Sequence, residues 1–328
     1  MMHTLVRSAA VAVIASLSFT QVQAQSKWPD RNITWVVPFA AGGPMDVVSR
    51  PVAKKMSEIL GVPIVIDNKT GAGGTTGMDF VSKSKPDGYT IGIASIGTQA
   101  IAPNHSKNVR YDPFSGFTNI GLLGKYVNVL VVKGDSLYKN PKEILAAAGD
   151  KSKNVTFGSA GIGASNHLSG ELLAVVGKQK LTHVPYRGSA PALTDLLAGN
   201  ITFMFDTLNT TMARFENGTL KPLAVTSPNR SPFLPNVPTM DEAGIKGYGE
   251  TGGEMWWGVV GPAGIPKEIL DKLNDALVKA LNSDDIKDQF KRQYVEAWPS
   301  SPAEFTKVVR TSHARWGKVI KEADIKSE

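Results

Sequence analysis

Short apolar runs, glycine-rich turns and amphipathic stretches follow one another in a fixed order along most of this chain. A β-branched and aromatic run at residues 33–37 leads into a glycine-rich turn at 38–44, and apolar residues at helical spacing then continue to residue 59. Strand, turn and helix units of this kind bury their apolar faces by stacking as parallel βαβ units. The order therefore predicts an α/β fold.

The same patterns place the other elements along the chain. We expect further strands at residues 62–66, 89–94, 128–132, 155–158, 182–185, 201–205 and 220–226. We expect further helices at residues 78–84, 141–148, 165–176, 191–197, 266–281, 284–294 and 302–323.

Two strand–glycine turn–helix units, near residues 33–60 and 155–176, predict two halves with a similar plan. The 328 residues suffice for two domains that each bury a core. We expect the chain to pass between the halves near residues 125–128 and 246–254. The expected bounds are 25–126 plus 247–328 for a discontinuous lobe 1, and 127–246 for lobe 2.

The first 24 residues have the features of an export signal. His3 and Arg7 give a weakly positive start, residues 9–19 are apolar, and small residues precede the expected cleavage site near Ala24. An apolar segment this short suits a cleaved signal peptide better than a membrane anchor, which is the alternative. We expect an exported, periplasmic product, because a secreted chain without cysteine suits a bacterial periplasm.

The composition of the chain argues against several classes of function. The chain has no cysteine and its five histidines lack ligand spacing, which excludes thiolate chemistry and predicts no metal site. The formal net charge of +7 is spread without basic runs, so we expect no nucleic-acid partner. Segment 71–77 resembles a dinucleotide-binding turn, but Thr76 stands where its third glycine belongs. No cofactor is expected.

Two strand-to-helix turns are candidate ligand sites. Turn 40–44 combines glycine backbone with the free N–H groups of a helix start, which suits an anion such as a carboxylate. A tight turn without a ligand is an equal alternative. Asp46 is expected to hold first-turn N–H groups and not the ligand. Turn 158–167 repeats the arrangement in the other half, with Ser165 as the expected N-cap and His167 as a packing residue.

An exported hydrolase that uses Ser165 is the enzyme alternative. Segment 163–167 lacks the second glycine of a nucleophile elbow. His167 follows only two positions later on the same helix start, where side chains diverge. We therefore expect binding without chemistry and no catalytic residues.

A series of motifs runs in order through nearly all of the chain after residue 24: residues 38–43 with Asp46 and Arg50, 68–69, 71–74, 85–90, 161–163 with 167–168, 183–188, 195–199, 235–239, 257–258 and 262–266. Together these motifs resemble the Bug-type solute receptors of tripartite tricarboxylate transporters. The resemblance implies a two-domain periplasmic-binding-protein (Venus-flytrap) fold with mixed, mainly parallel sheets and an interdomain cleft.

The resemblance also implies a role and partners. It implies a monomeric receptor that captures a di- or tricarboxylate, an aromatic one included, and delivers it to a two-subunit membrane permease. A receptor that presents its ligand to a membrane kinase is an alternative, because the sequence does not identify the surface that docks to a membrane partner.

Ligand contacts in both lobes follow from the same resemblance. In lobe 1 the implied contacts are Phe39, Ala41, Gly42 and Gly43 with Asp46 in support, then Ser95 and Thr98 after the third strand. In lobe 2 they are Ala160, Gly161, Gly163 and Ser165, with Tyr186, Gly188 and Asp206 lining the cleft.

Two departures from the family pattern bear on the ligand. Pro44-Met45 stands where a small residue and a hydroxyl are common, and Ala164 stands where serine is common. The loss of these hydroxyls favours a less polar ligand, such as an aromatic or long-chain acid. Met45, Phe205 and Trp256 are apolar candidates for contacting it, although core packing is the expected role of the last two.

Overall fold

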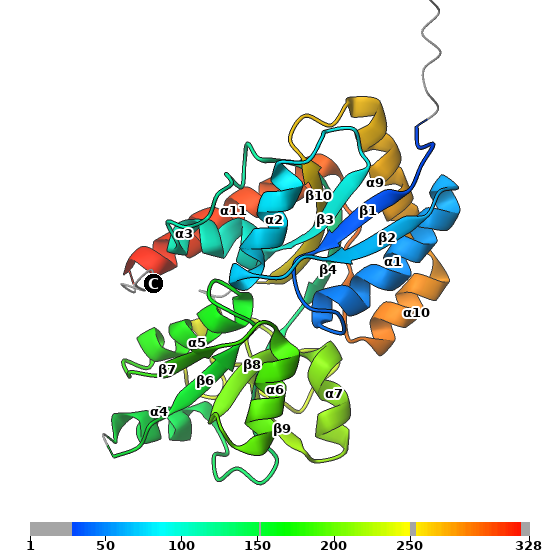
Figure 1. The fold of residues 1–328 in the computed structure, drawn as a ribbon. Helices are drawn as coiled ribbons and strands as arrows, with labels where there is room; N and C mark the ends of the chain where they lie inside the picture. Colours follow the sequence, from blue (N-terminus) through cyan, green and yellow to red (C-terminus); the bar gives the residue numbers. More distant parts are fainter. Residues whose placement is uncertain (1–27, 151, 250–253, 323–328) are drawn as a thin grey trace, which may run out of the picture.

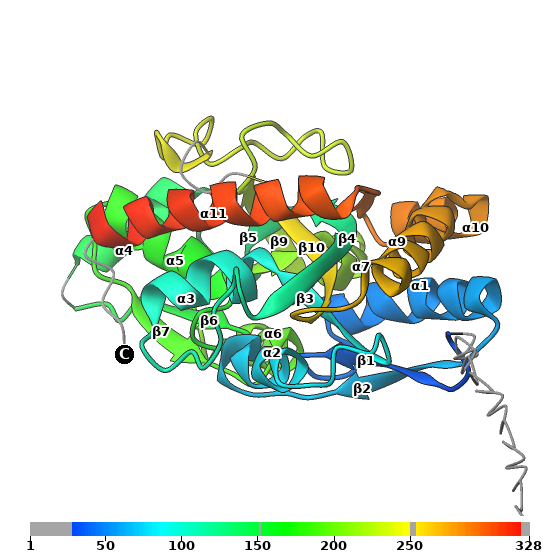
Figure 2. The same cartoon turned by 90° about the horizontal axis from the view of Figure 1, so that it is seen from above.

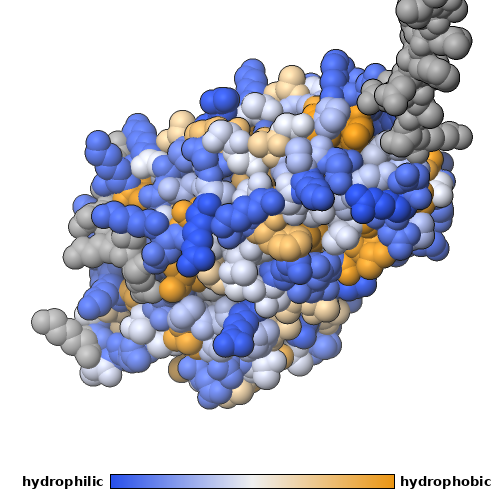
Figure 3. Space-filling model, turned by 45° about the horizontal axis from the view of Figure 1, so that its top comes forward, coloured by the Kyte–Doolittle hydropathy of each residue, from blue (hydrophilic) through white to orange (hydrophobic). Residues whose placement is uncertain are grey.

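A computed structural model describes residues 28–150, 152–249 and 254–322, which form two α/β lobes, each built on its own sheet (Figure 1). The expected signal peptide, part of the expected crossing at 246–254 and the last residue of the expected helix 302–323 lie outside these residues. Within the described ranges, no helix combines the length and the apolar character that crossing a membrane requires. The face in Figure 3 is mostly hydrophilic, with hydrophobic residues in small separate groups.

Lobe 1 contains a six-stranded sheet in the order β11-β4-β10-β3-β1-β2. Its strands are β1 (Ile33–Val37), β2 (Ile64–Asn68), β3 (Thr90–Ser95), β4 (Phe117–Tyr126), β10 (Met255–Pro262) and β11 (Glu296–Ala297). β1 is parallel to β2 and β3, whereas β10 runs antiparallel between β3 and β4. Segments from both ends of the chain therefore build one sheet.

The helices of lobe 1 flank this sheet. They are α1 (Pro44–Leu60), α2 (Thr75–Ser82), α3 (Ala102–His105), α9 (Lys267–Asn282), α10 (Asp284–Arg292) and α11 (Pro302–Glu322), with the short turn η1 (Ala72–Gly74) and the π-helical turn η2 (Gly97–Ile101). α9 packs against α1, and α11 packs along η2 and β4 (Figure 2). Trp35, Trp256 and Trp316 are among the largest buried side chains of the core.

Lobe 2 contains a five-stranded sheet in the order β7-β6-β8-β5-β9. Its strands are β5 (Asn128–Lys133), β6 (Thr156–Ser159), β7 (Thr182–Pro185), β8 (Phe203–Thr207) and β9 (Leu220–Val225), and its helices are α4 (Pro141–Gly149), α5 (Ser165–Val176), α6 (Ser189–Ala198) and α7 (Leu208–Glu216). All five residues of the central strand β8 are buried, because α5 and α6 pack against it. The chain passes from the first sheet to the second between Tyr126 and Asn128, inside the expected crossing at 125–128.

The sheets are mixed, as expected, but the expectation that they are mainly parallel is wrong. Four of the nine strand pairings in the described chain are parallel and five are antiparallel. The antiparallel pairings involve β4, β5, β10 and β11, which lie at the crossings or return from the far end of the chain. Their direction depends on where the chain re-enters a sheet, and no local pattern records that.

No strand or helix was expected at β4, β10, β11, α3 or α7. β4 carries Gly121 and Gly124, which interrupt its β-branched pattern. A Cβ at either position would lie 2.9–3.1 Å from its nearest neighbours, so both glycines allow close packing. The other expected elements lie within three residues of their observed bounds.

Glycine backbone forms a close contact between the lobes. A Cβ on Gly73 of η1 would lie 1.8 Å from the carbonyl oxygen of Ile162, in the turn between β6 and α5. A Cβ on Gly97 of η2 would lie 3.2 Å from the backbone nitrogen of Ser165. The approach of the two lobes therefore depends on the absence of side chains at these turns.

Candidate ligand-binding cavity

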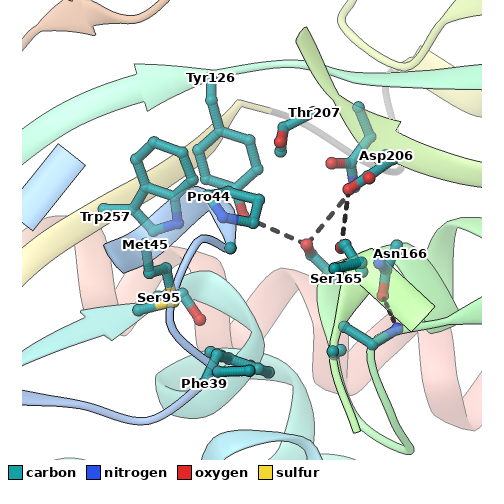
Figure 4. A pocket seen from close by; sticks show the side chains of 18 residues that line it. Phe39, Pro44, Met45, Ser95, Tyr126, Ser165, Asn166, Asp206, Thr207 and Trp257 are labelled. Carbon is teal, nitrogen blue, oxygen red and sulfur yellow. Dashed lines mark hydrogen bonds between the residues drawn. The ribbon is translucent and has the colours of Figure 1, made fainter. Parts of the chain in front are cut away.

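A cavity lies between the lobes, where β3, β4 and β8 end (Figure 4). Its empty space is about 580 Å³ when the part that is open to solvent is included. Lobe 1 lines it with Phe39, Ala40, Gly43, Pro44, Met45, Ser95, Tyr126 and Trp257. Lobe 2 lines it with Asn128, Ala160, Ala164, Ser165, Asn166, Gly188, Ser189, Ala190, Asp206 and Thr207.

The starts of four helices meet at this cavity. Pro44 begins α1, Ser165 begins α5, Ser189 begins α6, and Thr207 is the residue before α7. A helix start leaves N–H groups without intrahelical partners and carries the positive end of the helix dipole. The four together make the cavity favourable for negative charge without a basic side chain.

The first turn is held from behind by Asp46. Its carboxylate accepts the Gly42 N–H at 2.9 Å, the Asn68 amide at 3.1 Å and two bonds from Arg50 at 2.8 Å. Asn68 also donates to the Phe39 carbonyl at 2.9 Å. Burial opposes ionisation of Asp46, but the bonds from Arg50, Gly42 and Asn68 lower its pKa below the ordinary value. The expectation that Asp46 orients the turn agrees with these contacts.

Ser165 is the centre of a hydrogen-bond network at the start of α5. Its hydroxyl accepts from the Tyr126 hydroxyl at 3.2 Å and from the Asn128 amide at 3.4 Å. In these contacts Ser165 donates its own hydroxyl hydrogen to no described residue, so the hydroxyl can donate to a ligand. Ser169 fixes the orientation of the Asn128 amide, because it donates to the Ser165 carbonyl and can only accept from Asn128 Nδ2. Asn128 Oδ1 is then a buried acceptor without a partner at the cavity wall.

Asp206 of β8 is a buried carboxyl in the lobe 2 wall of the cavity. It accepts from the hydroxyls of Ser189 and Thr210, both at 2.9 Å. Burial raises its pKa to about 6, although these bonds and the charge of Arg214 favour the ionised form. Asp206 therefore ties the starts of α6 and α7 to the cavity wall.

The apolar part of the lining lies on lobe 1. The rings of Tyr126 and Trp257 stack with centroids 4.1 Å apart and planes 16° apart. Met45 is buried beside them, and Figure 4 shows Pro44 and Met45 on the same side of the cavity as both rings.

Seven of the fourteen residues implied by the resemblance line the cavity: Phe39, Gly43, Ser95, Ala160, Ser165, Gly188 and Asp206. The other seven lie outside the lining: Ala41, Gly42, Asp46, Thr98, Gly161, Gly163 and Tyr186.

The seven residues outside the lining have other contacts. Ala41 and Gly42 are exposed in the first turn. Thr98 is buried and donates its N–H to the Ser95 hydroxyl at 3.2 Å. The Tyr186 hydroxyl donates to Asp195 at 2.6 Å, and therefore supports the wall from outside. Gly161 and Gly163 have φ of +126° and +80°, and both contact lobe 1.

Several lining residues were not among those implied: Ala40, Tyr126, Asn128, Asn166, Ser189, Ala190, Thr207 and Trp257. Trp257 lines the cavity and Trp256 does not, because side chains alternate along β10. Trp256 is buried in the core, as expected, and donates from Nε1 to Ser312 of α11 at 3.0 Å. Phe205 packs near Phe203 and Tyr248 in the core, as expected.

The surroundings of Ser165 do not resemble those of a hydrolytic nucleophile. Its described partners are a phenol and an amide, and neither is a base at neutral pH. His167 accepts the Gly163 N–H at Nδ1, and burial followed by the neighbouring histidines His183 and His105 lowers its pKa to about 2. His167 is therefore a packing and hydrogen-bonding residue, in agreement with the expectation.

Known proteins match this chain over most of its length. The family model described as "Tripartite tricarboxylate transporter family receptor" matches residues 48–325. A protein in the tcbD-tcbE intergenic region of Pseudomonas sp. (strain P51) is 36% identical over 96% of this chain and 93% of its own length. Protein BugT of Bordetella pertussis is 29% identical over 95% of each chain.

Solved structures share both fold and sequence with the chain. The periplasmic binding protein BugD superposes with a TM-score of 0.86 at 35% identity, covering 92% of this chain and all of BugD. MatC from Rhodopseudomonas palustris with bound malate superposes at 0.85 with 31% identity, covering 89% of this chain and all of MatC. R. palustris Rpa4515 with adipate superposes at 0.85 with 34% identity, covering 91% of this chain and 99% of Rpa4515.

Proposed function

The chain belongs to the tripartite tricarboxylate transporter receptor family, and on that premise we propose that it captures an organic carboxylate in the periplasm and delivers it to a two-subunit membrane permease. The relatives of known structure include proteins solved with malate and adipate, both of which are carboxylates. The proposal assigns binding without chemistry, and a monomer whose lobe 1 is residues 25–126 plus 247–328 and whose lobe 2 is 127–246.

The observation that carries the proposal is the meeting of helix starts from opposite lobes at one cavity. α1 reaches it from lobe 1, and α5, α6 and α7 reach it from lobe 2. Ser95 and Ser165 add hydroxyl groups from opposite lobes, each of which accepts a hydrogen bond and keeps its own hydrogen available within the described structure. A carboxylate needs donors of this kind on both sides.

The proposed contacts divide into two groups. Phe39, Gly43, Ser95, Ala160, Ser165, Gly188 and Asp206 contact the ligand or its bound water directly, because they line the cavity. Ala41, Gly42, Asp46, Thr98, Gly161, Gly163 and Tyr186 support those contacts from behind.

We propose that binding couples to closure of the two lobes. Ligand shifts the population of the closed form only by its greater affinity for that form. Main-chain dipoles bind less strongly than buried Lys or Arg side chains would, which keeps release to the permease feasible. Micromolar affinity, about −8 kcal/mol, fits this role.

Calorimetric titration of the purified receptor with a carboxylate panel, preceded by a thermal-shift screen, tests the proposal. We expect Gly43→Val to abolish binding and to leave the protein folded, because its side chain would crowd the lining beside the Ala40 carbonyl, which lies 3.1 Å from the added Cβ. Gly149→Val, in α4 and away from the cavity, is the control and should bind normally. Unchanged affinity in Gly43→Val would show that the cavity is not the site.

A further inference from the structure

A tyrosine follows the end of α10 at a position where glycine is favoured. α10 ends at Arg292, and the Tyr294 N–H donates to the Lys291 carbonyl at 3.1 Å. The Val295 N–H donates to the Phe290 carbonyl at 2.9 Å. These two bonds form a Schellman motif, in which the left-handed residue is usually glycine. Tyr294 occupies that position with φ of +57°, so its side chain makes the local backbone less favourable.

The Tyr294 side chain reaches the other lobe. Tyr294 precedes β11 in lobe 1, whereas Phe233 follows β9 in lobe 2. The two rings pack edge to face, with centroids 5.6 Å apart and planes 80° apart. Both rings also pack against the buried cluster of lobe 2 that includes Val129 and Val225. An aromatic pair of this geometry gains energy beyond the area that it buries. A contact between the lobes therefore offsets the backbone cost of a tyrosine at this position.

This ring pair lies beside the crossing between the lobes. Phe233 and Tyr294 line a second cavity together with Lys125, Tyr126 and Val127, which carry the chain from β4 to β5. Rotation of one lobe relative to the other about this crossing must slide one ring over the other. In the arrangement that contains the ring pair, η1 also contacts the turn before α5. The ring pair is therefore a contact of the close arrangement of the lobes.

We propose that Tyr294 is a positioning residue for closure: its ring packs on Phe233 and favours the arrangement in which the lobes are close. The inference rests on the proposed closure of the receptor, and it places one control of closure outside the cavity lining. Removal of the ring should lower the population of the close arrangement even when no ligand is present, because the contact belongs to the protein alone.

An engineered disulfide measures the close arrangement without a ligand. A Cβ on Gly188 of lobe 2 would lie 3.7 Å from the Cβ of Ala40 of lobe 1, which suits a disulfide. The chain has no cysteine, so Ala40→Cys with Gly188→Cys supplies a single reporter pair. With glutathione disulfide as the oxidant, the rate of bond formation reports how often the lobes are close. All variants carry the same pair, so the strain of a side chain at residue 188, with φ of +146°, is common to them.

In this reporter protein, Tyr294→Gly should form the disulfide at least two-fold more slowly and keep the circular-dichroism spectrum. Lys178→Gly is the matched control. Lys178 is exposed after the end of α5 and has φ of +51°. Its motif has the same two bonds, from Lys178 to Val175 at 3.0 Å and from Gln179 to Ala174 at 2.9 Å. Lys178→Gly should leave the rate unchanged, and so should Tyr294→Phe, which keeps the ring.

The partner ring supplies a second test. Phe233→Ala should slow disulfide formation as Tyr294→Gly does, and the variant with both changes should be no slower than either alone, because the two residues share one contact. An unchanged rate in Tyr294→Gly would overturn the inference. Slowing by both changes that adds up would also overturn it, since the residues would then act independently.

The absence of ligand separates this inference from the proposed function. Slower disulfide formation in Tyr294→Gly, together with no binding of malate, adipate or any other acid of the panel, would support the role of Tyr294 and contradict the carboxylate receptor. Normal binding of an acid, together with an unchanged rate, would contradict the role of Tyr294 alone.

Discussion

At the scale of single residues, the chemistry of the cavity depends on a few buried polar groups. Asp46 is 2% exposed, and its oxygens are occupied by the turn, Asn68 and Arg50. Ser165 is held by Tyr126 and keeps a hydrogen for a ligand. Asp46 supports the turn from outside the cavity, whereas Ser165 faces the cavity. Removing Asp46 should therefore affect stability, and removing Ser165 should affect ligand binding.

We expect Asp46→Ala to lower the free energy of unfolding by about 2–3 kcal/mol, because it leaves buried donors of the turn and of Asn68 without an acceptor. Chemical denaturation measures this. Asp285→Ala is the control, since Asp285 pairs at 3.0 Å with Lys55 on the surface. Solvent screens that exposed pair, so its loss should have little effect on stability. Equal effects of the two variants would contradict the structural role of Asp46.

We expect Ser165→Ala to weaken ligand binding about ten-fold, roughly 1.4 kcal/mol, because one hydroxyl donor is lost. Ser84→Ala should leave affinity nearly unchanged, since the Ser84 hydroxyl donates to the Phe80 carbonyl in an exposed hydrogen bond and lies outside the lining. Calorimetry measures both. Neither variant nor the wild type should hydrolyse carboxylic esters, and turnover that vanishes in Ser165→Ala would restore the hydrolase alternative.

At the scale of elements, the position of helix starts and turns makes the site. α1 and α5 each follow a strand through a glycine-containing turn, and both begin at the cavity. The turn after β6 also contacts η1, where Gly73 has no side chain to block it. The close approach of the two lobes thus depends on η1, which lies outside the cavity lining.

We expect Gly73→Ala to lower ligand affinity at least ten-fold without abolishing folding, because its Cβ would collide with the Ile162 carbonyl only when the lobes are close. Gly199→Ala is the matched control. It has a similar positive φ of +82°, against +62° for Gly73, but nothing lies within 4 Å of its added Cβ. Small-angle scattering with ligand should show an open form only for Gly73→Ala, and normal closure of that variant would contradict the contact.

At the scale of the whole molecule, three neighbouring histidines form a cluster that includes residues of both lobes. His105 of lobe 1 lies 5.5 Å from His167 of lobe 2, and His167 lies 4.1 Å from His183, measured between ring centroids. Burial, followed by the neighbouring histidines, lowers the pKa of His167 to about 2 and that of His183 to about 4. Glu171 is the acid nearest His167, at 3.7 Å.

These pKa values predict acid sensitivity. Below pH 6.5 the unfolded chain binds a proton at each histidine, while folded His183 does so only near pH 4 and folded His167 only near pH 2. His167 alone should therefore reduce the free energy of unfolding by about 1.4 kcal/mol per pH unit as the pH falls from 6.5. Asp206 acts in the opposite direction between pH 3.8 and about 6, because its folded pKa is raised.

Denaturant titrations of the wild type and of His167→Gln, from pH 4.5 to 7.5, measure this dependence. The variant should show a shallower decline of stability toward low pH. His313→Gln serves as a control, because His313 lies by Phe114, outside the cluster. Equal slopes for wild type and His167→Gln would contradict the assignment.

Local sequence patterns predict the α/β class, the bounds of most elements and the two turns that reach the cavity. These follow from local patterns, since β-branched runs, glycines and helical spacing act within one unit of the chain. β4 was not predicted, because its glycines interrupt the strand pattern and its partner β10 lies more than a hundred residues away in the chain.

Only the tertiary structure decided the direction of the strands at the lobe crossings, and which side chains share the cavity. Trp257 lines it and Trp256 does not, although they are neighbours in the chain, because the pleat of β10 turns them to opposite faces. The ends of the two sheets lie at the cavity, and this brings together Tyr126, Asn128 and Asp206. Such long-range proximity depends on how the lobes pack, and no local stretch of sequence encodes it alone.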